Sequence, residues 1–145
     1  MQTIHADLPM TVDQFVTWDG DPGRHYELVD GRVRLMPIEP PIHGALLVTL
    51  GGLVGGIGDH HHLVSCIRVG VRIPGRDDAF YAPDLSMSAP PLRKDALWLD
   101  HPVLVAEVLS AESRTHDLGN KVPDYMLIPS IQDILLIDSS RRHVQ

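Results

Sequence analysis

Three charged side chains in this sequence could do chemistry together: Glu107, Asp84 and Lys121. Glu107 interrupts the otherwise apolar segment 103–109, where an ionised carboxylate is costly unless a cation or hydrogen-bond donors compensate it. Asp84 follows a proline upstream, and Lys121 lies downstream. Two carboxylates and an ammonium brought together would bind a hard divalent ion such as Mg²⁺ and act on a phosphate. We therefore take Asp84 and Glu107 as candidate metal ligands and Lys121 as the candidate catalytic cation.

Each of these residues also has a purely structural explanation. Asp84 could be a turn residue at the end of a strand. Glu107 could form a salt bridge with Arg68 or Arg72. Lys121 could be a solvated surface lysine. The sequence leaves both kinds of explanation open.

The composition limits the class of protein. The chain has 145 residues, of which 43% are hydrophobic and 21% charged, so we predict a single folded domain over residues 1–145. The formal net charge is -7, which argues against broad attraction to a nucleic-acid backbone, so any such contact needs a local basic patch. The lone Cys66 cannot form an internal disulfide and no leader opens the chain, so we expect a cytoplasmic location.

Local patterns predict the elements of the first third of the chain. Thr11 and Gln14 have the spacing of a capping box, which predicts a short helix that begins there. An Asp-Gly pair between two β-prone arms predicts a hairpin over residues 26–36. Alternation along the second arm places Arg32 and Arg34 on one face of that hairpin.

The next segments are predicted to form a helix and a strand. The long apolar run favours a helix over residues 42–54, which we expect to be buried and which is too short to span a bilayer comfortably. Its glycines either allow close approach to a sheet or end the helix early. Residues 67–74 alternate as in a half-buried strand, with Arg68 and Arg72 on the polar face.

The second half of the chain favours strands around the candidate residues. One strand approaches Asp84, the segment 103–109 forms another, and residues 133–138 form a third. Pro123 disturbs any helix drawn through Lys121, because an interior proline removes a hydrogen bond and clashes with the preceding turn. The order of helices and strands predicts an α/β sandwich with a mixed sheet.

The candidate residues belong to an ordered set of motifs: Pro83-Asp84, Glu107-Val108-Leu109-Ser110, Asp117, Lys121, Tyr125 and Ile137-Asp138. This set resembles the Uma family of restriction-endonuclease-like proteins, formerly a domain of unknown function, in the PD-(D/E)XK superfamily. The resemblance runs from about Tyr26 to the C-terminus. It implies a restriction-endonuclease-like fold, in which a central mixed β-sheet is flanked by helices.

The resemblance also implies roles for individual residues. Asp84 and Glu107 would bind Mg²⁺ or Mn²⁺. The superfamily pattern places a lysine two residues after that glutamate, but here the position is Leu109, and the family residue that matches the lysine is Lys121.

Further residues match family positions. Glu27 could be a third site carboxylate, although a cross-strand pair with Arg34 explains it almost as well. His43 could approach the metal or a phosphate, or it could be a buried, hydrogen-bonded histidine. Asp117 is expected to cap the helix that carries Lys121.

Other motifs give little support to other chemistries. His60, His61 and His62 could bind a transition metal, but adjacent residues rarely converge on one ion, so we expect them in a solvated loop. The glycine-rich segment lacks the ending of a phosphate loop, so no nucleotide cofactor is expected. Ser110 and Cys66 have no readable catalytic triad around them.

The sequence therefore favours a metal-dependent endonuclease that hydrolyses phosphodiester bonds in DNA. Arg32, Arg34, Arg68 and Arg72 are candidate contacts to the DNA backbone. A homodimer is implied by the resemblance, and no membrane contact is expected. The alternative is a catalytically inactive binding or regulatory module of the same fold.

The end of the chain raises a separate question. Family members usually continue into further strands, and residues 143–145 look like the first residues of one. We expect either a protein shorter than its relatives or one that lacks its C-terminal strands.

Overall fold

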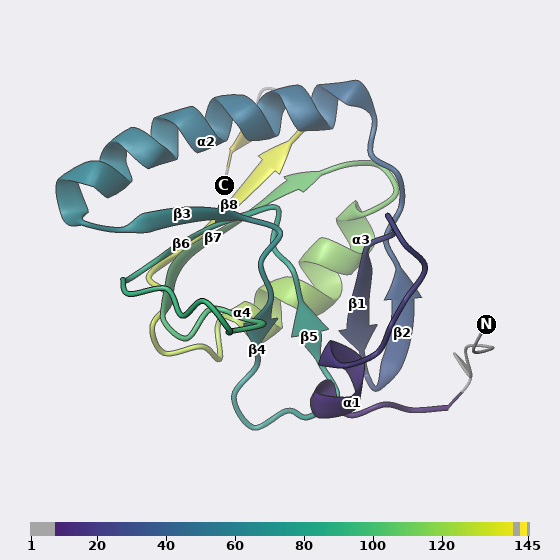
Figure 1. Ribbon diagram of the computed structural model, residues 1–145. Coiled ribbons are helices and arrows are strands. Elements are labelled where there is room, and N and C mark those ends of the chain that lie inside the picture. The colour runs from purple at the N-terminus through teal and green to yellow at the C-terminus, as the bar shows by residue number, and fades with distance from the viewer. Residues whose placement is uncertain (1–7, 141–142, 145) are drawn as a thin grey trace.

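The computed structural model describes residues 8–140 and 143–144 (Figure 1). Its helical elements are α1 (Val12–Val16), α2 (Pro41–His61), α3 (Arg114–His116), the π-helical turn η1 (Asp117–Lys121) and α4 (Val122–Tyr125). Its strands are β1 (Tyr26–Val29), β2 (Arg32–Leu35), β3 (Val64–Ile67), β4 (Val71–Arg72), β5 (Phe80–Tyr81), β6 (Leu85–Ser88), β7 (Pro102–Leu109), β8 (Asp133–Asp138) and β9 (His143–Val144).

The strands form two sheets. One is antiparallel, with the order β2-β1-β5-β4, and the other is mixed, with the order β3-β6-β7-β8-β9. In the mixed sheet β7 pairs in parallel with β8, and the helical segment α3–η1–α4 makes the crossover between them. Helix α2 covers the opposite face of the mixed sheet (Figure 1). The predicted α/β sandwich with a central mixed sheet and flanking helices is confirmed, with a smaller antiparallel sheet beside it.

Two local predictions are confirmed in detail. Thr11 caps α1, and its side chain and that of Gln14 form the reciprocal bonds of a capping box. Strands β1 and β2 form the predicted hairpin, whose turn residues Asp30 and Gly31 have φ values of 50° and 75°. Both residues need positive φ in such a two-residue turn, which is why the Asp-Gly pair is so informative.

The predicted strand over residues 67–74 is wrong. Strand β3 ends at Ile67 in the mixed sheet, and β4 begins at Val71 in the antiparallel sheet. Between them Arg68 has a φ of 52°, in the left-handed region that residues other than glycine rarely adopt. This residue redirects the chain from one sheet to the other, so the alternation continues in the sequence while the strand does not.

Helix α2 is longer and more exposed than predicted. It continues through the glycines to His61, and Gly51 and Gly58 are the ones that approach the sheet, against Leu85 and Met87. Its inner face packs on the mixed sheet, but apolar side chains on its outer face are exposed. By length and composition it is also the one helix among the described residues that would suit a membrane span.

The helical segment between β7 and β8 continues past Pro123 without a break. The turn Asp117–Lys121 is π-helical, and the N–H of Val122 donates to the carbonyl of Asp117, five residues back. This wider turn precedes Pro123, which stands in the first turn of α4, where a missing N–H is tolerated. Lys121 is therefore the last residue of a π-helical turn, a feature often found at functional sites.

Candidate active site

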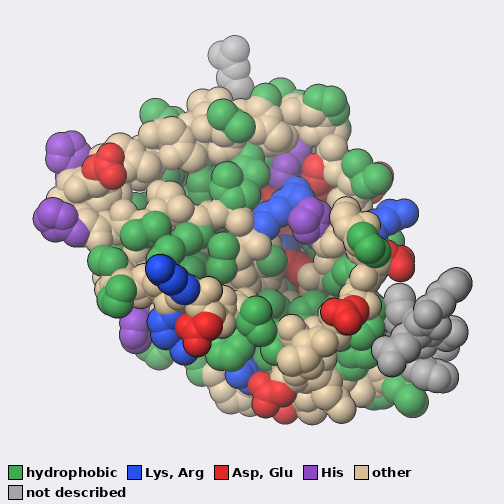
Figure 2. Space-filling view, in the orientation of Figure 1, with side chains coloured by type: hydrophobic (Ala, Val, Ile, Leu, Met, Phe, Trp, Pro, Cys, Tyr) green, Lys and Arg blue, Asp and Glu red, His purple; other side chains and the backbone are tan. Residues whose placement is uncertain are grey.

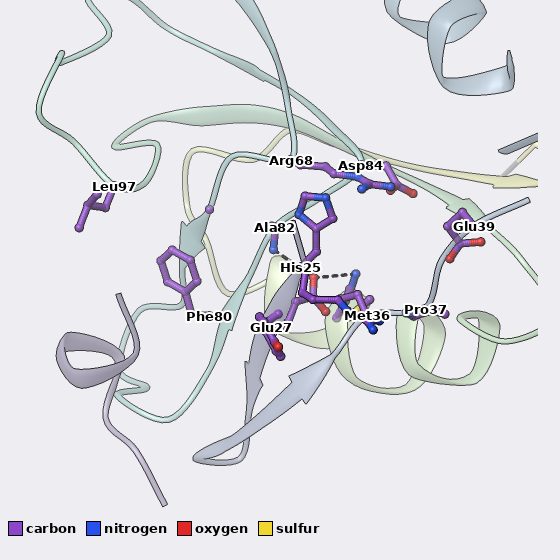
Figure 3. A pocket seen from close by; sticks show the side chains of 14 residues that line it. His25, Glu27, Met36, Pro37, Glu39, Arg68, Phe80, Ala82, Asp84 and Leu97 are labelled. Carbon is purple, nitrogen blue, oxygen red and sulfur yellow. Dashed lines mark hydrogen bonds and ion pairs between the residues drawn. The ribbon is translucent and has the colours of Figure 1, made fainter. Parts of the chain in front are cut away.

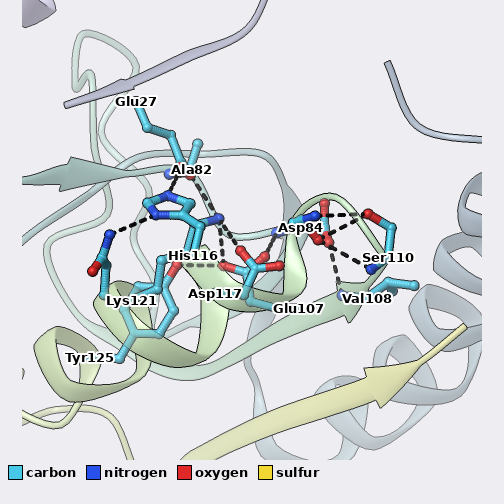
Figure 4. Close-up of polar contacts among 12 residues, drawn as sticks. Glu27, Ala82, Asp84, Glu107, Val108, Ser110, His116, Asp117, Lys121 and Tyr125 are labelled. Carbon is cyan, nitrogen blue, oxygen red and sulfur yellow. Dashed lines mark hydrogen bonds and ion pairs between the residues drawn. The ribbon is translucent and has the colours of Figure 1, made fainter. Parts of the chain in front are cut away.

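Asp84 and Glu107 come from adjacent strands of the mixed sheet. Asp84 immediately precedes β6, whose Leu85 is the register partner of Ala106 in β7. The Asp84 carboxylate accepts the N–H of Val108 at 2.9 Å, and the N–H of Asp84 lies 3.5 Å from Glu107 Oε2. Sheet pairing thus fixes the two carboxyl groups beside each other (Figure 4).

Lys121 lies among three carboxylates. Its Nζ is 2.9 Å from Glu27 Oε1, 3.2 Å from Glu107 Oε1 and 3.1 Å from Asp117 Oδ1. Although Asp117 Oδ1 lies this close to the lysine Nζ, it accepts no hydrogen bond, so its attraction to the ammonium is Coulombic. Lys121, Glu27, Glu107 and Asp117 are all buried. The ammonium is therefore held beside Glu107, as a catalytic cation would be.

A tyrosine and two histidines hold the carboxylates in place through hydrogen bonds. The hydroxyl of Tyr125 donates to Glu107 Oε1 at 2.6 Å. Nε2 of His116 lies 3.0 Å from Glu27 Oε2, and Nε2 of His43 lies 3.1 Å from Asp84 Oδ2. Such partners orient ligating carboxylates and tune their basicity.

The carboxylates differ in protonation behaviour. Burial opposes ionisation of Glu27, but hydrogen bonds from His116 and the charge of Lys121 outweigh it and lower its pKa. Burial likewise opposes ionisation of Asp84, and hydrogen bonds from His43 and the Val108 N–H lower its pKa overall. For Glu107 burial prevails over Lys121 and raises the pKa to about 8. The ammonium of Lys121 alone does not offset the burial of Glu107.

At Lys121, in contrast to Glu107, the surroundings favour the charged form. Burial disfavours its charge, yet the carboxylates of Glu107, Glu27 and Asp117 outweigh that effect and raise its pKa above the ordinary lysine value. Lys121 therefore stays an ammonium, suited to stabilise negative charge rather than to accept a proton.

Several structural explanations from the sequence are wrong. Glu107 makes its ion pair with Lys121 rather than with Arg68 or Arg72, and Lys121 is buried, so it is no surface lysine. Glu27 is the register partner of Arg34, but its carboxylate contacts Lys121 and His116 instead.

Asp117 has a role other than the one expected, and His43 has one of its two expected roles. The Asp117 side chain does not cap a helix, since α3 continues directly into η1, and its carboxylate pairs with Lys121 instead. His43 is buried and hydrogen-bonded, which was one of its two expected roles, and it orients Asp84. His116 was not singled out from the sequence, because its partner Glu27 is 89 positions away and no local spacing marks the pair.

The site opens into a cleft of about 270 Å³. Figure 2 shows a hollow beneath α2 where basic, acidic and histidine side chains lie together. Asp84, Glu27 and Lys121 line the cleft, while Glu107 is buried. Of the four arginines predicted to contact a backbone, only Arg68 lines this cleft, where Arg24 and His25 join it.

The other predicted arginines lie elsewhere. Arg72 pairs with Asp13 and Asp77 and packs over the ring of Trp98. Arg34 lines a separate shallow pocket. Arg24 and His25, which were not singled out from the sequence, lie directly before β1. Their position beside the predicted hairpin was the only sequence signal that could have marked them as cleft residues.

The three consecutive histidines do not form a metal site. His60 and His61 are in the last turn of α2 and His62 is its C-cap, rather than in a loop. Among the described residues no group of three His, Cys, Asp or Glu side chains is arranged to hold a metal ion. Their place at a helix C-terminus suits them electrostatically.

The residues present fit a divalent cation held by two carboxylates. The contacts to the Asp84 carboxylate engage its Oδ2. Glu107 Oε1 is engaged by Lys121 and Tyr125, while Glu107 Oε2 accepts only the long 3.5 Å contact from the N–H of Asp84. Mg²⁺ is commonly held by one or two carboxylates and completes its shell with water and phosphate oxygens. Because the pKa of Glu107 is raised, added positive charge beside this carboxylate would favour its ionised form.

The fold and the recessed carboxylate–lysine cluster together define a restriction-endonuclease-like protein. The fold matches a crystal structure from Anabaena variabilis, described as "a putative nuclease belonging to DUF820", with a TM-score of 0.72 and 20% identity over 90% of this chain and 74% of that one. Residues 12–145 match the Uma2 family, described as "Putative restriction endonuclease", and the chain belongs to that family. An uncharacterized protein from Synechocystis sp. is 26% identical over 140 residues, which cover 90% of this chain and 70% of that protein.

Proposed function

We propose that this protein is a Mg²⁺- or Mn²⁺-dependent endonuclease that hydrolyses phosphodiester bonds in DNA. The observation that carries the proposal is the pair of carboxylates Asp84 and Glu107, fixed side by side on adjacent strands with the ammonium of Lys121 at 3.2 Å from Glu107. A bound divalent ion would lower the pKa of a water molecule and stabilise charge on the phosphate. Membership of the Uma2 family, whose description is "Putative restriction endonuclease", supports the same conclusion.

The protein's own side chains have separable tasks in this proposal. Asp84 and Glu107 supply the ligand oxygens, and His43 and Tyr125 hold these carboxylates in place. Lys121 remains charged and stabilises negative charge that develops on the phosphate. Glu27 and Asp117 hold the lysine at that position.

The test is a plasmid-nicking assay in Mg²⁺ and Mn²⁺ with wild-type protein, Glu107→Gln and Asp84→Asn. We expect nicking by the wild type and a loss of at least about 100-fold in each variant, because each removes a ligand charge. Asp100→Asn is the matched control, since Asp100 pairs with Arg93 on the surface, away from the cleft. Intact plasmid with wild-type protein would favour the inactive binding module, and equal nicking by all variants would place the chemistry elsewhere.

The homodimer and the cytoplasmic location stay predictions. Light scattering after size-exclusion chromatography tests the first, and cell fractionation tests the second.

A further inference from the structure

The catalytic groups are recessed, and this restricts which DNA can reach them. Lys121 is 2% exposed and Glu107 1%, and Asp84 reaches solvent through the cleft. A phosphate must therefore enter the cleft to meet these side chains. At about 270 Å³ the cleft is near the lower end of the roughly 300–1,000 Å³ typical of small-ligand sites. It has room for one nucleotide unit and none for the width of a duplex.

The cleft has a polar end and an apolar end. Figure 3 shows Arg68 beside Asp84 at one end, Leu97 and Phe80 at the other, and His25 between them. The polar end offers charges to a phosphate, and the apolar end offers a wall to a base. This order of surfaces matches the order of groups in a single nucleotide.

The backbone is shaped to produce both ends. At the polar end, Arg68 has a φ of 52°, a conformation that is strained for a residue with a Cβ and often marks a functional position. At the apolar end, Gly70 lies so close to the Phe80 ring that a Cβ there would overlap the ring. The absence of a side chain at Gly70 lets the edge of the Phe80 ring approach the backbone at the wall of the cleft.

The charge distribution also disfavours an extended duplex footprint. Of the ten Lys and Arg side chains that the structure describes, half are already in ion pairs: Arg72, Arg76, Arg93, Arg114 and Lys121. Duplex binding typically needs several unpaired cations along a surface. With a net charge of -7, the protein is better suited to hold one phosphate in a cleft, aided by Arg68 and Arg24.

We propose that the cleft binds one unpaired deoxynucleotide, with its phosphate beside Asp84 and Arg68 and its base against Leu97 and Phe80. The preferred substrate is then single-stranded or locally opened DNA rather than continuous duplex, since an unpaired base can leave the stack and enter a pocket. This inference rests on the proposed endonuclease function, because it assigns the substrate form of the same site.

The first test measures binding of one fluorescein-labelled oligonucleotide, single-stranded or annealed to its complement, by fluorescence anisotropy at fixed ionic strength. Ca²⁺ replaces Mg²⁺, and a gel checks that the oligonucleotide stays intact. We expect the wild type to bind the single strand about tenfold more tightly than the duplex, the scale of one stacked base. Equal or tighter binding of the duplex, or no binding of the single strand, would overturn the inference.

Variants of Leu97 test the apolar wall. Leu97 is 54% exposed, so its replacement should leave the fold intact, which circular dichroism checks. Leu97→Glu should abolish the single-strand preference and Leu97→Trp should increase it, because an indole stacks on a base. Leu92→Glu is the matched control, since Leu92 is an exposed leucine of the same connecting segment and lines a different pocket. Unchanged single-strand affinity in both Leu97 variants would also overturn the inference.

The failures of the two proposals are distinguishable. Nicking of plasmid without any single-strand preference would remove this inference and leave the endonuclease in place. Single-strand binding through Leu97 without cleavage of any DNA in Mg²⁺ or Mn²⁺ would remove the endonuclease and leave a nucleotide-binding cleft.

Discussion

Two regions of the molecule surround a single cation with three carboxylates, yet they behave differently. The Lys121 cluster consists of Lys121, Glu27, Glu107 and Asp117. The Arg76 cluster consists of Arg76, Asp30, Asp78 and Asp124. In each, a tyrosine hydroxyl donates to one carboxylate at 2.6 Å, from Tyr125 to Glu107 and from Tyr81 to Asp124.

The clusters differ in how well the cation satisfies its partners. The guanidinium of Arg76 donates hydrogen bonds to all three carboxylates, and its bond to Asp78 lowers the pKa of that carboxyl group. The ammonium of Lys121 has fewer donors than a guanidinium. Burial, with the nearby negative charge of Asp84 adding to it, outweighs Lys121 and raises the pKa of Glu107 to about 8. The same number of charges thus yields a cluster whose carboxylates are all hydrogen-bonded to the cation in one place, and in the other a cluster in which the pKa of Glu107 stays raised.

Removal of the buried lysine should have the largest effect on stability. Lys121→Met leaves the carboxylates of Glu27 and Asp117 buried without their cation, so we expect a loss of about 3–5 kcal/mol in the free energy of unfolding. Urea denaturation near pH 7 measures it. Lys94→Met, at an exposed position, is the control and should change stability by less than about 0.5 kcal/mol. A loss below about 1 kcal/mol for Lys121→Met would mean that the lysine does not compensate these charges.

Removal of the arginine should cost less and should not affect metal binding. Arg76 is 27% exposed, so water can solvate part of what it leaves, and we expect Arg76→Met to cost about 1–3 kcal/mol. The stabilisation by Mg²⁺, measured as the shift in Tm, should be the same as in wild type. A smaller Mg²⁺ shift in this variant would show that the two clusters are coupled through Asp124 and Tyr125, contrary to the comparison.

The pH dependence of the stabilisation by Mg²⁺ should also distinguish the Lys121 cluster from the Arg76 cluster. The folded-state pKa of Glu107 is raised from 4.5 to about 8, so its contribution to stability without metal is complete below about 4.5 and is lost as the pH rises through about 8. Mg²⁺ must displace that proton, so its stabilising effect should grow by up to about 1.4 kcal/mol per pH unit from about pH 6 to about pH 8.

Thermal melts with Mg²⁺ and with EDTA across this range measure the effect. In Glu107→Gln the pH dependence of the Mg²⁺ effect should disappear. A Mg²⁺ effect that decreases with rising pH in the wild type would contradict the assignment of the proton to Glu107.

Local elements of this fold could be predicted because their signals are local. The capping box of Thr11 and the Asp-Gly turn each act within four residues, so the sequence alone defines them. The break at Arg68 could not be predicted, because alternating residues on both sides of it satisfy two different sheets. The length of α2 was underestimated because glycine propensity is a weak prior that packing on a sheet overrides.

The candidate site shows the same limit. Glu107 could be found because a carboxylate in an apolar strand conflicts with its surroundings. Asp84 and Lys121 show no such local conflict, so their assignment as candidates gained most of its support from the family motif. The role of Asp117 and the pair of His116 with Glu27 depend on a π-helical turn and on contacts between distant elements. Such contacts leave no spacing in the sequence, so the support of the site appears only in three dimensions.

The most direct test of the central claim is calorimetric titration of Mn²⁺ into wild-type and Glu107→Gln protein near pH 8. Asp124→Asn serves as the control, because it removes a carboxylate from the Arg76 cluster rather than from the site. We predict that the wild type and Asp124→Asn bind Mn²⁺ with similar affinity and that Glu107→Gln binds none in the same range. Equal binding by all three proteins, or by none of them, would contradict the assignment of Asp84 and Glu107 as the metal ligands.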